Sequence, residues 1–232
     1  MENRYEVYHF SSIASTNDFA KTLIPTRQNA IIYADEQLGG RGTKGRVFSS
    51  NKGGVYATKL NFYQNYHAKN AFEIMAKTAV AVCKTLEDYG LNACIKWPND
   101  VYVSDKKICG ILIENAFSGN QISYSIVGVG LNVCNHLPAE LSEIATTMSS
   151  LMLVSPSVDE VRQTLFMHWE ADFSMQDYLS RVGYLGQECT LLAGEQSHRA
   201  VLLSVDEEGG LHAMVGGEEK RFTSAEISIR IR

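Results

Sequence analysis

The sequence contains no apolar run long enough to cross a bilayer. Its uninterrupted apolar stretches are short, as at Ile111–Ile113, whereas a transmembrane helix needs about 20 mostly apolar residues. The sequence begins Met1-Glu2-Asn3-Arg4 and lacks the apolar core of a secretory signal near its N-terminus. We therefore expect a cytoplasmic protein that does not enter a membrane.

Cysteine is sparse and does not form metal-binding or disulfide patterns. There are five cysteines, an odd number, and no two of them form a C-x-x-C pair. Disulfide frameworks and zinc sites use even or closely spaced sets of cysteine. The pattern therefore predicts reduced, mostly buried thiols in a reducing compartment.

Basic residues are outnumbered, with 21 Lys and Arg against 26 Asp and Glu and a net charge of -5. This balance argues against a surface that binds nucleic acid over most of its area. The segment from Gln37 to Phe72 is the exception, because it holds six basic residues and no acidic one. A locally cationic segment in an acidic protein predicts an anion as its ligand.

The length of 232 residues and the apolar content of 45% fit one large domain with a small appendage. Apolar spacing predicts a helix over about 70–89 and a second that starts near Ser155 and extends its apolar face to Phe173. Strands are predicted at 30–33, 55–62, 93–96, 101–103, 108–115 and 122–129. After Gly183, five short strands within about 50 residues predict a small β-barrel.

A glycine-rich loop lies inside the cationic segment. Residues 40–45, Gly-Arg-Gly-Thr-Lys-Gly, match G-x-G-x-x-G, but no helix follows and no acid stands about 20 residues on, so a dinucleotide-binding turn is excluded. No Gly-Lys-Ser/Thr is present either, which excludes a Walker A loop. Glycines interleaved with Arg41, Lys44 and Arg46 suit contact with phosphate oxygens. The alternative is a surface turn with solvated bases.

Three further clusters carry polar residues at strand ends. They are Lys96-Trp97-Pro98-Asn99-Asp100, then residues 107–114 (Lys-Ile-Cys-Gly-Ile-Leu-Ile-Glu), then Gly128-Val129-Gly130-Leu131-Asn132. Each has an ordinary structural interpretation: turn chemistry after proline, a lysine that protects a strand edge, and a glycine pair at a strand end.

Together with Ser15-Thr16-Asn17 and Gln37, these clusters resemble in order and spacing the catalytic domain of biotin–protein ligases (biotin–[acetyl-CoA-carboxylase] ligases), over about Tyr8 to Asn135. The resemblance implies an α+β fold. In that fold a mixed, mainly antiparallel sheet packs with helices in a class II synthetase-like catalytic domain, residues 1–183. A small C-terminal SH3-like β-barrel, residues 184–232, is implied as well.

The resemblance also implies an ATP-dependent reaction in two steps. Biotin carboxylate attacks the α-phosphate of Mg²⁺-bound ATP to give biotinyl-5′-AMP and pyrophosphate, and a lysine of a biotin carboxyl carrier protein domain then attacks the mixed anhydride. Such chemistry requires no enzyme nucleophile, so positioning and electrostatic stabilisation must supply the catalysis. Neither nucleic acid nor a membrane is an implied partner. Family members differ in oligomeric state, which leaves a homodimer open.

Site residues follow by motif position. The resemblance implies that Arg41, Asp100 and Lys107 are catalytic. Lys107 would contact the carboxylate and α-phosphate oxygens. Asp100 would orient or deprotonate the incoming lysine, because an ordinary lysine is protonated at neutral pH. The implied biotin-binding residues are Ser15, Thr16, Asn17, Gln37, Arg41, Gly42, Thr43, Lys107, Gly110 and Gly128. The implied nucleotide-binding residues are Arg46, Phe48, Asn99, Asp100 and Asn132. The sequence assigns no metal ligands.

Two departures from the family pattern matter. Thr43 stands where many members have a further arginine, so the loop has one cation fewer, with Lys44 beside it as a replacement. Bifunctional members carry a helix-turn-helix module ahead of this domain, whereas Ser15 occurs almost at once here, so we expect a monofunctional ligase.

Two alternatives remain. A lipoate–protein ligase or octanoyltransferase shares the fold, but its Arg-Arg-x-x-Gly-Gly-Gly-type loop and His-Asp pair do not occur here. A non-catalytic binding module of the same fold is the other, and the joint presence of Arg41, Asp100 and Lys107 argues against it.

Overall fold

The structure is a computed structural model that describes residues 5–194 and 196–231. The start of the chain, Met1–Arg4, on which the expectation about a signal segment rests, lies outside the described residues. The side chains of Lys44 and Ile231 also lie outside the description. Among the described residues, no helix has the length and apolar character needed to cross a membrane. All five thiols are free, and three of them are buried.

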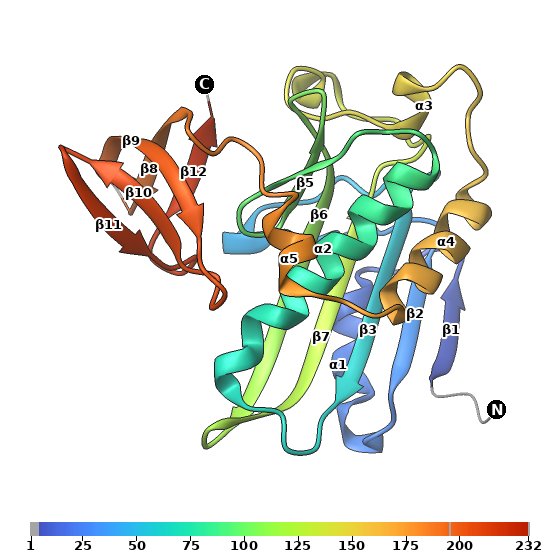
Figure 1. The fold of residues 1–232 in the computed structure, drawn as a ribbon. Coiled ribbons are helices and arrows are strands. Elements are labelled where there is room, and N and C mark those ends of the chain that lie inside the picture. The colour runs from blue at the N-terminus through green and yellow to red at the C-terminus, as the bar shows by residue number, and fades with distance from the viewer. Residues whose placement is uncertain (1–4, 195, 232) are drawn as a thin grey trace.

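A seven-stranded sheet forms the centre of the larger part of the molecule (Figure 1). Its strands are paired in the order β1-β2-β3-β7-β6-β5-β4. Only the β1–β2 pair among them is parallel, so the predicted mixed, mainly antiparallel sheet is confirmed. The bounds are β1 Glu6–Phe10, β2 Ala30–Ala34, β3 Val55–Phe62, β4 Cys94–Lys96, β5 Asp100–Val103, β6 Lys106–Ser118 and β7 Gln121–Leu131.

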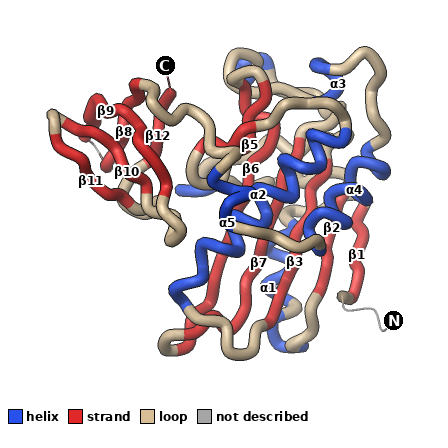
Figure 2. The backbone as a smooth tube through the Cα atoms, in the orientation of Figure 1, coloured by secondary structure: helices blue, strands red, loops and turns tan. Residues whose placement is uncertain are grey.

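Helices cover both faces of this sheet (Figures 1 and 2). Three of them, α2 (Ala71–Asp88), α4 (Val158–Glu170) and α5 (Met175–Leu179), lie on one face, and α1 (Thr16–Thr22) lies on the other. Side chains alternate across a strand, so Ala57 of β3 joins the core beneath α2 while Leu60 joins a smaller core that contains Ala20 of α1. The sheet is therefore buried on both sides where α1 packs.

The second predicted helix is shorter than its apolar spacing suggested. The helix α4 ends at Glu170, and Ala171 after it has an extended backbone, so Phe173 does not belong to the helical face. Ser174 then caps the separate helix α5. A further short helix, α3 (Met148–Leu151), was not predicted, because one turn of helix offers too few residues for an apolar period.

A second sheet follows at the C-terminal end and lies beside the first (Figure 1). Its five strands are paired in the order β11-β10-β9-β8-β12. Within the described residues β11 and β12 are the two outer strands and do not pair, so a closed SH3-like barrel is not confirmed, and the boundary after residue 183 stays a prediction. The bounds are β8 Glu188–Ala193, β9 Gln196–Val205, β10 Leu211–Val215, β11 Glu218–Phe222 and β12 Ser228–Ile231.

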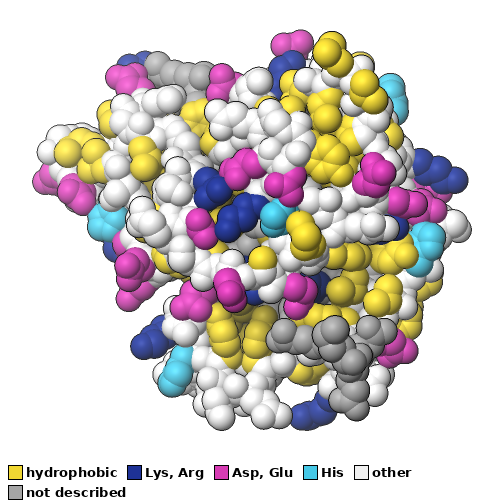
Figure 3. Space-filling view, turned by 45° about the vertical axis from the view of Figure 1, so that its right-hand side comes forward, with side chains coloured by type: hydrophobic (Ala, Val, Ile, Leu, Met, Phe, Trp, Pro, Cys, Tyr) yellow, Lys and Arg dark blue, Asp and Glu magenta, His cyan; other side chains and the backbone are white. Residues whose placement is uncertain are grey.

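The charged side chains do not separate by sign on the face shown in Figure 3. Basic and acidic groups lie intermixed there, between apolar patches. This arrangement agrees with the moderate net charge of -5.

Candidate active site

A cavity of about 770 Å³ is lined by residues of both the large sheet and the second sheet. It brings together all of the residues predicted for the site, whose assigned roles stay predictions. These residues are Ser15, Thr16, Asn17, Gln37, Arg41, Gly42, Thr43, Arg46, Phe48, Asn99, Asp100, Lys107, Gly110, Gly128 and Asn132. They come from the start of α1, from the segment 37–48 that contains the glycine-rich loop, and from β5, β6, β7 and the residues next to these strands.

Glycines on β6 and β7 form part of the cavity floor. Gly110 pairs with Gly130 across the two strands, and Gly128 pairs with Leu112. A Cβ atom at Gly130 would lie 2.5 Å from the Phe48 ring, and one at Gly128 would lie 2.3 Å from Asn17 Oδ1. The absence of side chains at these positions therefore allows two predicted site residues to reach the sheet surface.

The end of the cavity beside α1 is a polar network. Ser15 caps the helix by accepting a hydrogen bond from the Asp18 N–H at 3.3 Å. Thr16 donates to Gln37 Oε1 through both its backbone N–H, at 2.9 Å, and its hydroxyl, at 3.0 Å. Asn17 Oδ1 lies 2.7 Å from the hydroxyl of buried Thr58. Fixed donors and acceptors of this kind suit a small polar ligand.

The glycine-rich loop folds back on itself. The Gly42 N–H donates to the Arg46 carbonyl at 2.7 Å, and Thr43 begins a single 3-10 turn. The Arg46 guanidinium donates to the Thr43 carbonyl at 3.2 Å and to its hydroxyl at 2.8 Å. Arg41 pairs with Asp18 of α1 at 2.7 Å. The replacement predicted for Lys44 rests on a side chain outside the described part of the structure.

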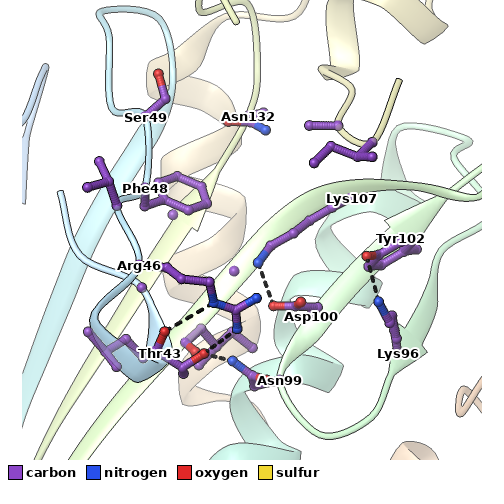
Figure 4. Close-up of a pocket in the computed structure, with 18 of the residues that line it drawn as sticks. Thr43, Arg46, Phe48, Ser49, Lys96, Asn99, Asp100, Tyr102, Lys107 and Asn132 are labelled. Carbon is purple, nitrogen blue, oxygen red and sulfur yellow. Dashed lines mark hydrogen bonds and ion pairs between the residues drawn. The ribbon is translucent and has the colours of Figure 1, made fainter. Parts of the chain in front are cut away.

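An acid and a base meet between the loop and the β5–β6 hairpin. Lys107 Nζ lies 2.6 Å from Asp100 Oδ1, and their side chains are only 27% and 15% exposed. Figure 4 shows the two pointing toward one another below the Phe48 ring, whose centre is 6.0 Å from the Lys107 amine. The half-buried ammonium group of Lys107 is suited to stabilise negative charge in a transition state. The carboxylate beside it is suited to accept or donate a proton.

The two asparagines hold the backbone around this pair. Asn99 Nδ2 donates to the Ile111 carbonyl at 2.8 Å, while the Ile111 N–H donates to the Asn99 carbonyl at 3.1 Å. Asn132 Nδ2 donates to the Thr146 carbonyl at 3.1 Å. Both side chains therefore have a structural role in addition to their place in the cavity wall.

Sequence reasoning missed several residues of the cavity wall. Lys96 donates to the Tyr102 hydroxyl at 3.1 Å (Figure 4). Burial lowers the pKa of Lys96, with the charges of Lys107, Arg46 and Arg230 acting in the same direction and that of Asp100 against it. Burial, with a smaller effect from Asp100, raises the pKa of Tyr102 to about 12.

Lys96 opens the Lys-Trp-Pro-Asn-Asp cluster named above, which was a usable indication that it belongs to the site. Arg230, in β12, came with no such indication, because no local pattern tells which strand of a second sheet faces a distant cavity. The same holds for the apolar wall contributed by Leu137, Leu141 and Ile144.

Among the described residues, no group of three or more His, Cys, Asp or Glu side chains is close enough to hold a metal ion.

Comparisons with known proteins identify the family. The profile of the Biotin/lipoate A/B protein ligase family matches residues 9–132. The bifunctional ligase/repressor BirA of Bacillus subtilis is 27% identical over 96% of this chain and 73% of its own length. The biotin–[acetyl-CoA-carboxylase] ligase of Paracoccus denitrificans is 28% identical over 85% and 89%.

Among solved structures, the biotin protein ligase from Aquifex aeolicus in complex with biotin and ATP is similar, with a TM-score of 0.79 and 27% identity. The match covers 99% of both chains, so it includes the second sheet as well as the cavity. The family profile spans more than half of the chain and ends at Asn132, the last of the predicted site residues. The chain is a ligase and belongs to the biotin/lipoate A/B protein ligase family.

Proposed function

We propose that this ligase activates biotin with ATP as biotinyl-5′-AMP and transfers the biotinyl group to a lysine of a biotin carboxyl carrier protein. The observation that carries the proposal is the Lys107–Asp100 pair, at 2.6 Å, placed between a polar cradle at α1 and a cationic loop within one cavity. The similar ligases named above support biotin and ATP as ligands. Five free thiols favour a reducing compartment, the cytoplasm.

In the first step, a biotin carboxylate oxygen bonds to the α-phosphorus of ATP, and the bond from that phosphorus to the bridging oxygen breaks to release pyrophosphate. The network of Thr16, Asn17 and Gln37 would hold the biotin head, and Lys107 would contact the oxygens on which negative charge grows. One such positioned donor contributes about 10²–10³ in rate. Mg²⁺ enters as part of the nucleotide substrate.

In the second step, the amine of the carrier lysine bonds to the biotinyl carbonyl carbon and AMP leaves. The amine must first lose a proton, and of the cavity carboxylates Asp100, Asp105 and Glu143 we assign this role to Asp100, because it lies beside Lys107. Its Oδ1 atom is buried and contacts the Lys107 amine. That cation holds the carboxylate in one orientation, which favours a directed proton transfer.

The test is a biotinylation assay on the purified protein. Labelled biotin, Mg²⁺-ATP and a carboxyl carrier domain should give acid-stable label on the carrier, and a carrier whose target lysine is replaced by arginine should stay unlabelled. Without the carrier, we expect one equivalent of pyrophosphate per active site. A carrier left without acid-stable label would contradict the proposal. Label from lipoate in place of biotin would favour the lipoate ligase, and ligand binding without pyrophosphate release would favour a binding module.

A further inference from the structure

The turn that presents Asn99 and Asp100 is held from three directions. The Trp97 indole, only 4% exposed, donates from Nε1 to the Gly209 carbonyl of the second sheet at 3.0 Å. The Tyr178 hydroxyl of α5 donates to the Pro98 carbonyl at 3.2 Å. The exchange of hydrogen bonds between Asn99 and Ile111 of β6 supplies the third hold. Two of these hydrogen-bond partners, Gly209 and Tyr178, lie outside residues 9–132, the range that the family profile matches.

The Gly209 carbonyl is itself fixed by a braced turn between β9 and β10. Asp206 Oδ1 accepts hydrogen bonds from the N–H groups of Glu208, at 3.0 Å, and Gly210, at 2.7 Å. The Arg221 guanidinium of β11 donates to Asp206 Oδ2 at 2.6 Å. Because both carboxylate oxygens are occupied, the turn is rigid enough to present one carbonyl in a set direction.

A single aromatic side chain, Phe72, contacts both Tyr178 and Gly209. Phe72 of α2 meets the Tyr178 ring edge-on, with 5.2 Å between ring centres. It also packs directly on Gly209, where an added Cβ atom would lie 2.2 Å from its ring and where φ is +83°. Of these residues, Trp97 lines the cavity, whereas Phe72, Tyr178 and Gly209 are not among the described residues of its wall. Phe72, Tyr178 and Gly209 can therefore influence the cavity only through the turn of residues 97–100.

We propose that Tyr178 and the Gly209 carbonyl position Asp100 for catalysis, which makes α5 and the second sheet working parts of the active site. The inference rests on the proposed function, because that function gives Asp100 its role. The strand β5 begins at Asp100, directly after the held residues, so a shift of the turn moves the carboxylate relative to Lys107. A displacement of about 1 Å at a reacting group can cost about 10²-fold in rate.

The chain offers matched controls for both holds. Tyr178→Phe removes one hydroxyl from a fully buried tyrosine that donates to a backbone carbonyl, and Tyr56→Phe makes the same change where the hydroxyl donates to the Asn51 carbonyl. Trp97→Phe removes an indole N–H that bonds Gly209, and Trp169→Phe removes one that bonds Thr78. Each control residue, Tyr56 or Trp169, is a buried aromatic whose hydrogen bond does not go to the turn of residues 97–100.

The readout is the rate per active site at saturating biotin, ATP and carrier, with active sites counted from the burst of pyrophosphate. We expect Tyr178→Phe and Trp97→Phe each to lower this kcat about tenfold or more, with the KM for biotin changed less than about threefold. The control variants should keep kcat within about twofold, although their melting temperatures fall as well. Because both holds act on one turn, the double variant should lose less than the product of the single losses.

Equal losses of kcat in the test and control variants would overturn the inference. So would an unchanged kcat in Tyr178→Phe, which loses only a hydroxyl and is decisive if Trp97→Phe does not fold. A wild-type protein without a pyrophosphate burst would instead contradict the proposed function itself. The two failures are therefore distinguishable.

Discussion

Thr43 is the residue of the glycine-rich loop at which the family resemblance implies a departure from the usual arginine. Its carbonyl and hydroxyl both accept hydrogen bonds from the Arg46 guanidinium, which ties the neighbouring arginine to the loop. Threonine therefore contributes an acceptor where an arginine would contribute a cation. Two other cations of the loop are described. The Arg41 side chain is 50% exposed and pairs with Asp18. Arg46 is exposed and is bonded to Thr43 within the loop.

Replacing Thr43 with arginine is expected to slow the escape of biotinyl-5′-AMP. The added cation would face an anionic phosphate at a partly exposed position, where an ion pair adds about 1 kcal/mol, or about fivefold in the off-rate. The measurement is release of labelled biotinyl-AMP into a chase of unlabelled ligand. Thr43→Ala, which removes the hydroxyl acceptor without adding charge, should not slow release. An off-rate equal to or faster than wild type in Thr43→Arg would refute this reading of the loop.

Lys107 is the second residue whose replacement has a defined outcome. Lys107→Ala removes the cation that faces Asp100 at 2.6 Å, and with it the donor proposed for the charge that develops on phosphate. Adenylate formation should fall by about 10²-fold or more, followed as pyrophosphate release. Lys106→Ala changes the preceding residue of β6, whose amine bonds the Ser142 carbonyl at 2.7 Å, and should retain most of the activity. Unchanged pyrophosphate release in Lys107→Ala would exclude its assigned role.

At the level of elements, long regular segments were predictable and short or remotely paired ones were not. The helix α2 was predicted to within one residue at each end, because five turns of apolar spacing define it. The strands β6 and β7 extend beyond their predicted ends, because cross-strand pairing carries polar residues such as Ser118 and Gln121 into the ladder. The strand β1 has an exposed edge and pairs only with β2 in the described structure, so local pattern gave no indication of it.

Two glycines of β7, Gly128 and Gly130, face different ends of the cavity: Gly128 lies against Asn17 and Gly130 against Phe48. Gly128→Ala would push a methyl group against Asn17 Oδ1, at 2.3 Å, and Gly130→Ala would push one against the Phe48 ring, at 2.5 Å. We expect the first variant to raise the KM for biotin and the second to raise the KM for ATP, each by about tenfold, since overpacking costs about 1–3 kcal/mol. Steady-state kinetics with each substrate varied in turn would measure both.

The assignment of the two ends can be checked by relief of the clash. In the double variant Gly130→Ala/Phe48→Leu the smaller side chain leaves room for the methyl group, so the combined loss should be smaller than the sum of the single losses. The same Phe48→Leu change should give no relief to Gly128→Ala. If both glycine variants raised the same KM, the proposed division of the cavity would be wrong.

For the whole molecule, the order of motifs predicted the cavity residues, but it did so through a family resemblance. Spacing along the chain does not state that Ser15 and Asn132 lie in one wall, because strand pairing between distant segments decides it. The second sheet shows the same limit. Its strands were predicted from short apolar runs and glycine turns, whereas its side chains in the cavity wall, such as Gln187 and Arg230, follow from packing between the two sheets.

The pH dependence of stability should report on the braced turn of the second sheet. His212 of β10 lies between Glu219, at 2.9 Å, and Asp206, at 3.2 Å, and hydrogen bonds to these two carboxylates raise its pKa. Burial alone would raise the pKa of Asp206, but the hydrogen bond from Arg221, followed by those from Gly210 and His212, lowers it to about 2. The turn and the adjoining strand β10 therefore contain one group favoured in its protonated form, His212, and one favoured in its ionised form, Asp206.

The two groups act in different pH windows. A raised histidine pKa means that the folded state binds the proton more tightly than the unfolded chain. This contribution is complete below the ordinary histidine pKa of about 6.5 and is lost as pH rises through the raised value. The Asp206 contribution holds above about 3.9 and is lost only as pH falls toward 2. Of these two groups, only His212 therefore changes its contribution to stability between pH 5.5 and 8.5.

The variant His212→Gln isolates this contribution, because glutamine keeps hydrogen-bonding capacity without a titrating charge. We expect the melting temperature of the wild type to exceed that of His212→Gln at pH 5.5 and the difference to shrink steadily toward pH 8.5. A difference that stayed constant across this range would show that the histidine contributes packing alone. Because the Gly209 carbonyl, which bonds Trp97, belongs to the turn that Asp206 braces, loosening at high pH would act first on the junction between the two sheets.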